Sequence, residues 1–111
     1  MLRYNVSHSG DISILKVDGK LDCLTVPEVR PEIDKFVERD VKKVILDASG
    51  IELLDSSGVA VIVSLFKRLR AVGGDVRIAA LGGQPKSIFN LLRLDRALPV
   101  FPTVEEATKG F

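Results

Sequence analysis

The fold is decided by residues 42–81, which read KKVILDASGIELLDSSGVAVIVSLFKRLRAVGGDVRIAAL. Residues 44–46 are a short apolar run rich in β-branched side chains, typical of a strand that is covered on both faces, and residues 76–81 predict another covered strand. Between them, residues 57–72 predict a helix that is apolar nearly all round in its first half and basic later, and two glycines then end it. A strand, a helix and a strand in this order predict a right-handed crossover between parallel strands.

Upstream of this unit, the pattern predicts an antiparallel hairpin. Residues 2–6 alternate between apolar and polar side chains, and residues 12–17 form a second strand after a turn. The apolar phase of the second strand slips after Ile14, which predicts either a bulge or burial on both faces. We expect residues 18–22 to leave the sheet, and residues 47–55 to connect the next strand to the long helix.

A first helix is predicted between the hairpin and residue 42. Thr25 and Glu28 have the spacing of a capping box, and apolar residues then follow at helical spacing up to residue 37. Pro31 lacks a backbone N–H and is expected to kink a helix that starts at Thr25. The alternative is a regular helix that begins near Pro31.

The C-terminal third predicts two more helices around a short extended piece. Residues 82–85 (GGQP) open one helix, and residues 98–101 are extended. A second capping box at Thr103 begins the last helix. The whole chain, residues 1–111, is therefore predicted to be one α/β domain. It has a mixed sheet of four or five strands, an N-terminal antiparallel hairpin and four helices packed on the sheet.

Composition excludes several classes of function. The chain has 16 basic and 15 acidic residues, so its net charge of +1 gives no electrostatic basis for binding nucleic acid. One Cys and one His are too few for an internal disulfide or an ordinary zinc site, and no cofactor is expected. The longest apolar run, residues 59–63, is too short to span a bilayer, and the polar start does not resemble a signal peptide. We therefore expect a cytoplasmic protein without membrane insertion.

The most unusual local feature is the sequence from Asp55 to Gly58, where a loop becomes a helix. One interpretation is a cap, in which Asp55, Ser56 or Ser57 accepts from the unpaired N–H groups of the first turn, while Gly58 allows close packing. The other is phosphorylation, because a helix N-terminus tolerates an anion. The two are compatible, since one serine can cap while the other faces solvent.

Catalysis by either serine is disfavoured. A serine nucleophile needs a nearby base, and the only histidine, His8, is expected in the exposed turn of the first hairpin. The remaining candidates are predicted to be structural. Lys42 and Lys43 are expected in a solvated turn, residues 82–83 in a strand-to-helix turn, and Cys23 as a buried or half-buried thiol.

The chain resembles the STAS domains, specifically the bacterial anti-sigma factor antagonists. Residues 55–60 (DSSGVA) resemble the signature of that family, and residues 19–22 (GKLD) resemble its second motif. Residues 94–107 resemble its C-terminal pattern. The resemblance covers essentially the whole chain and preserves the order of elements, and the motifs together are fairly specific.

The resemblance implies a partner switch rather than an enzyme. In such a switch, the unmodified antagonist binds an anti-sigma factor that is also a serine kinase, and this binding frees a sigma factor for transcription. The kinase phosphorylates the serine directly after the motif aspartate, here Ser56, and a serine phosphatase resets it. By position, Asp22, Asp55, Ser57 and Gly58 complete the implied partner-binding site.

One alternative keeps the fold and changes the role. The chain is then a STAS subunit of an ABC-type lipid transporter or of a multiprotein sensor complex. The sequence names neither the partner nor the regulated process. It leaves open both the influence of Pro31 on partner choice and the choice between a monomer and a weak homodimer.

Overall fold

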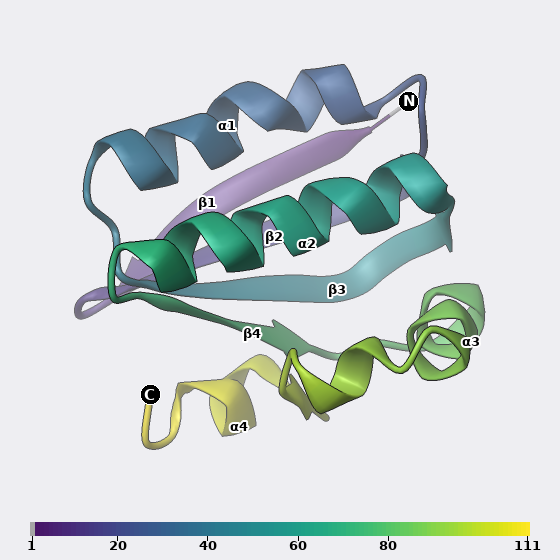
Figure 1. Cartoon of the computed structure of the whole chain (residues 1–111). Coiled ribbons are helices and arrows are strands. Elements are labelled where there is room, and N and C mark those ends of the chain that lie inside the picture. The colour runs from purple at the N-terminus through teal and green to yellow at the C-terminus, as the bar shows by residue number, and fades with distance from the viewer. Residues whose placement is uncertain (1) are drawn as a thin grey trace.

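The computed structural model describes residues 2–111 and shows a five-stranded sheet with helices on both faces (Figure 1). The elements in chain order are β1 (Arg3–Ser9), β2 (Ile12–Leu21), α1 (Val26–Glu38), β3 (Lys43–Leu54), α2 (Ser56–Ala71), β4 (Asp75–Ala79), α3 (Gly83–Leu91), a 3₁₀ turn (Leu94–Arg96), β5 (Val100–Phe101) and α4 (Val104–Thr108). The strands lie in the order in which they occur in the chain. β1 pairs antiparallel with β2, and every later pair is parallel. The predicted mixed sheet, hairpin and four helices are confirmed.

The core lies mainly between the sheet and the pair α1 and α2, which run side by side over one face (Figure 1). Leu65 and Leu69 of α2 are almost fully buried, facing β-strand side chains such as Val44 and Val76. The opposite face is covered by α4, whose Ala107 packs in a smaller apolar cluster. β2 contributes to both clusters, so burial on both faces is the alternative that the structure shows at the phase slip after Ile14.

The two central strands are longer than the sequence predicts. β2 continues to Leu21 and β3 to Leu54, so the expectation that residues 18–22 and 47–55 leave the sheet is wrong. The extensions pair with each other, Leu21 with Leu54, after register shifts within residues 16–20. These irregularities break the apolar alternation, which explains why the extensions are not visible in the sequence.

α1 follows the first of the two interpretations of its sequence, in which the helix starts at Thr25. The helix runs from Val26 through Pro31 to Glu38 with Thr25 as its N-cap, so the alternative of a regular helix that begins near Pro31 is wrong. Pro31 costs one backbone hydrogen bond, but the residue is exposed, so water can solvate the carbonyl left free. Thr25 precedes the helix but does not form the predicted capping box, because its hydroxyl donates to the Lys20 carbonyl instead (2.7 Å).

The last helix begins as predicted. The Thr103 hydroxyl accepts from the backbone N–H of Glu106 at 3.1 Å, which confirms the second capping site. No helix within residues 2–111 is long and apolar enough to cross a membrane.

Candidate functional site

The candidate site is built around Asp55, the residue between β3 and α2. Asp55 has an extended backbone and is the N-cap of α2: its Oδ1 accepts from the Gly58 N–H at 2.9 Å. Its Oδ2 accepts from the Cys23 N–H at 3.0 Å, across 32 residues of sequence. A single carboxylate therefore fixes the start of α2 and also ties the loop between β2 and α1 to it.

The same hydrogen bonds set the charge state of Asp55. The Gly58 N–H, helped by the N–H groups of Cys23 and Ser57, lowers the pKa of the Asp55 carboxyl against the opposing effect of desolvation. The ordinary pKa of an aspartate is about 3.9, so this group is ionised at neutral pH. A fixed negative charge therefore lies directly beside the serines.

The two serines are not equivalent. Ser56 is exposed at the first position of α2, whereas Ser57 is half-buried. Because Asp55 supplies the cap, neither hydroxyl is required for it, and the Ser56 side chain is accessible at the surface. Gly58 is buried, and a Cβ there would overlap the Leu21 carbonyl oxygen, which confirms that glycine allows close packing at this point.

Asp22 belongs to the neighbouring loop and shapes it. Its Oδ1 accepts from the backbone N–H groups of Leu24 (3.0 Å) and Thr25 (3.1 Å). The residues on either side, Leu21 and Cys23, both bond to Asp55. The structure thus brings the two predicted acidic positions into adjoining loops, with Asp22 half-buried.

Exposed apolar side chains occur on both of these segments. Leu24, in the loop that Asp22 shapes, is 82% exposed, and Leu53, two residues before Asp55, is 39% exposed. Sequence reasoning missed both residues, because an isolated leucine in a sequence carries no sign of its exposure.

Sequence reasoning also missed Gln84, which was interpreted only as part of a helix start. Its side-chain Oε1 accepts from the Leu54 N–H at 2.8 Å, and its Nε2 donates to the Leu54 carbonyl at 2.9 Å. Gln84 is therefore bonded to the residue immediately before Asp55. No local sequence signal could have revealed this, since the two residues are 30 positions apart.

Two other expectations need correction. His8 lies in β1 rather than in the turn, although it is exposed, and its Nδ1 is 3.2 Å from the Ser13 hydroxyl. Cys23 is exposed and not buried or half-buried, because it is held at the surface by its N–H bond to Asp55. Residues 82–83 do form a strand-to-helix turn, with Gly83 at a positive φ of 57°.

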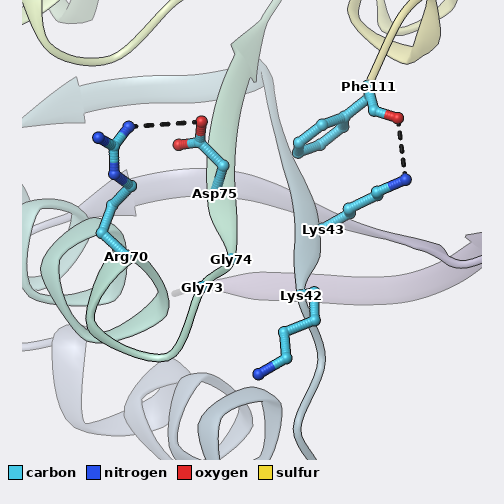
Figure 2. A pocket seen from close by; sticks show the side chains of 7 residues that line it. All are labelled: Lys42, Lys43, Arg70, Gly73, Gly74, Asp75 and Phe111. Carbon is cyan, nitrogen blue, oxygen red and sulfur yellow. Dashed lines mark hydrogen bonds and ion pairs between the residues drawn. The ribbon is translucent and has the colours of Figure 1, made fainter.

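A separate pocket of about 400 Å³ lies where α2 ends and β3 and β4 begin, away from Ser56 (Figure 2). Its cations are already engaged. Lys43 Nζ is 3.1 Å from an Asp11 carboxylate oxygen and also donates to the Phe111 carbonyl, and Arg70 pairs with Asp75 at 3.6 Å. Both ion pairs join chain segments around the pocket, Lys43 of β3 to Asp11 and Arg70 of α2 to Asp75 of β4. Across residues 2–111 no group of three or more His, Cys, Asp or Glu side chains is placed to hold a metal ion.

Comparison with known proteins gives a consistent result. A family model described as STAS domain matches residues 3–107 of the chain. The Anti-sigma F factor antagonist of Paenibacillus polymyxa is 23% identical over 101 residues, which are 90% of this chain and 86% of that protein.

Solved structures share the fold. An anti-sigma factor antagonist from Mycobacterium paratuberculosis superposes with a TM-score of 0.88 at 24% identity, covering 96% of this chain and 91% of that one. The Bacillus cell fate determinant SpoIIAA, solved in its phosphorylated form, gives a TM-score of 0.76 at 20% identity, covering 95% and 96%. At these identities the likeness establishes the fold.

Proposed function

The chain belongs to the STAS domain family, and on that premise we propose that it is an anti-sigma factor antagonist, a non-enzymatic regulator that acts by binding. In its unphosphorylated form it binds an anti-sigma factor that is also a serine kinase, and a sigma factor is thereby released. Phosphorylation at Ser56 switches this binding off, and a serine phosphatase restores it.

The observation that carries the proposal is that Asp55, and not a serine, caps α2. Asp55 fills the cap through the Gly58 N–H, and the exposed Ser56 is left as a hydroxyl that another protein can reach. Ser57 is half-buried and therefore the poorer acceptor. The proposed partner surface comprises Asp22, Asp55, Ser56, Ser57 and Gly58.

Charge explains how a phosphate at this position would act. A phosphoserine adds about −1.5 to −2 charges at neutral pH. The N-terminus of α2 stabilises such an anion locally by roughly 0.3–1 kcal/mol, so the fold is expected to survive the modification. A partner that complements the unmodified surface would instead meet added negative charge beside the ionised Asp55, with unfavourable desolvation.

The first experiment asks which hydroxyl is modified. The protein is incubated with ATP and a purified anti-sigma factor kinase from the same organism, and the phosphate is mapped by mass spectrometry. Ser56→Ala should abolish incorporation, whereas Ser57→Ala, the matched control in the same turn, should be modified at the normal rate. Phosphate on Ser57 alone would contradict the proposal and favour a structural subunit of a transporter or sensor.

A further inference from the structure

The end of β3 lacks a neighbouring strand on the side that faces away from β2. β4 pairs with β3 only from Lys43 to Asp47 and ends at Ala79, whereas β3 continues to Leu54. Leu54 is in register with Leu21 of β2, and its own side chain is buried. Backbone N–H and C=O groups in such a place need hydrogen-bond partners, because an unpaired buried group is costly.

Gln84 supplies both partners at once. Its carboxamide accepts from the Leu54 N–H (2.8 Å) and donates to the Leu54 carbonyl (2.9 Å). A carboxamide offers the same donor and acceptor as a peptide group, so Gln84 takes the place of one residue of the missing strand.

α3 fixes the position of Gln84. The helix lies beside the end of β3, at the same end of the sheet as the start of α2 (Figure 1). Phe89 of α3 is fully buried in the main core, and Pro85, next to Gln84, is also buried. A side chain on so well anchored a helix can act as a rigid support.

The segment that presents Ser56 is therefore held from two sides. On the β2 side, Asp55 accepts from the Cys23 N–H, and on the other side, Gln84 holds Leu54. We propose that Gln84 is a positioning residue for Ser56: its carboxamide fixes the end of β3 so that the hydroxyl is presented in the geometry that a kinase requires. This inference rests on the proposed function and adds to it a residue outside the family motifs found in the sequence.

Loss of the Gln84 support should lower the rate of Ser56 phosphorylation, because phosphoryl transfer depends on the alignment of the reacting hydroxyl. A misplacement of about 1 Å at a reacting group can cost roughly 100-fold in rate. Loss of a support two residues from the hydroxyl should therefore slow phosphorylation while the fold remains intact.

Two substitutions on the same helix separate this role from a general effect on α3. Gln84→Ala removes the support. Asn90→Ala removes a carboxamide of an exposed residue near the other end of α3 and serves as the matched control. Gln84→Glu is the conservative variant, since it keeps the acceptor for Leu54 N–H but loses the donor for Leu54 C=O.

The first readout needs no partner. Amide hydrogen exchange at Leu54 should be at least tenfold faster in Gln84→Ala than in the wild type and unchanged in Asn90→Ala. The Ile45 amide, in the centre of β3, should be unaffected in both. Unchanged exchange at Leu54 in Gln84→Ala would show that the carboxamide does not hold the strand, and would overturn the inference.

The second readout is the initial rate of Ser56 phosphorylation by the purified anti-sigma factor kinase, at a temperature where urea melts show every variant to be folded. The rate should fall at least fivefold in Gln84→Ala, fall less in Gln84→Glu, and stay normal in Asn90→Ala. Faster exchange at Leu54 with a normal rate would overturn the positioning role. A wild-type protein that no such kinase modifies would overturn the proposed function and this role with it, and the exchange result would still report on the support itself.

Discussion

Gly58 offers a test in which two physical effects have opposite signs. Replacing a glycine by alanine inside a helix normally stabilises it, by up to about 1 kcal/mol. At Gly58, however, the new Cβ would overlap the Leu21 carbonyl oxygen and crowd the Leu54 side chain. The first obstacle is backbone at the paired end of β2, which cannot rotate away as a side chain can.

The larger of the two effects decides whether Gly58→Ala raises or lowers the free energy of unfolding. Overpacking in a well-packed interior typically costs about 1–3 kcal/mol. Since the contact is with backbone, we expect the upper part of that range, and after the gain in helix propensity Gly58→Ala should lower the free energy of unfolding by about 1–2 kcal/mol.

Urea unfolding at neutral pH measures this difference, with linear extrapolation to water. Ala60→Gly is the matched control, because Ala60 is an exposed residue of the same helix and reports propensity without the contact. It should cost about 1 kcal/mol. A Gly58→Ala protein that is as stable as the wild type, or more stable, would refute the close approach of α2 to the end of β2.

Two further predictions concern the core and the cap. Leu65→Ala should lower the free energy of unfolding by about 2–5 kcal/mol in the same urea assay, because Leu65 is 1% exposed in the main core. Phe66→Ala should lower it by less, because Phe66 is partly exposed. Equal losses of stability in the two variants would show that α2 does not bury the face that carries Leu65. Because its pKa is lowered in the folded protein, the Asp55 carboxylate stabilises the fold at pH values above the ordinary aspartate pKa of about 3.9. This stabilisation is lost as the pH falls through the lower folded-state pKa. Asp55→Asn should therefore have a lower free energy of unfolding than the wild type at neutral pH, and the difference between the two proteins should narrow as the pH falls below about 3.9. A difference in the free energy of unfolding that stays constant in acid would show that the Asp55 charge is not its cause.

The order of elements could be predicted because the signals are local. A long apolar segment that turns basic and ends at two glycines marks α2, and the Thr103 cap marks the start of α4. The ends of β2 and β3 could not be predicted, because they depend on pairing between distant residues. Gly50 illustrates the problem: its lack of a Cβ leaves room for the Asp18 carboxylate on the adjoining strand, and in the sequence both residues read as a loop.

For the candidate site, too, the local features could be predicted from the sequence and the contacts between distant residues could not. The position of Asp55 at a helix start was visible in the sequence, and so was the possibility that only one serine faces solvent. The bonds that Asp55 makes to Cys23 and that Gln84 makes to Leu54 were not visible, since each joins residues 30 or more positions apart. Cys23 was misjudged for this reason: a cysteine is usually buried, but here its backbone is held in a surface loop.

The most direct test of the central claim compares the affinity of the unmodified and the Ser56-phosphorylated protein for the anti-sigma factor kinase by titration calorimetry. Phosphorylation should weaken binding at least tenfold, which corresponds to about 1.4 kcal/mol. Ser56→Ala should bind like the unmodified protein and Ser56→Asp should bind weakly, with circular dichroism showing both to be folded. Equal affinity of the two forms for the kinase would contradict the proposal that a phosphate on Ser56 switches this protein off.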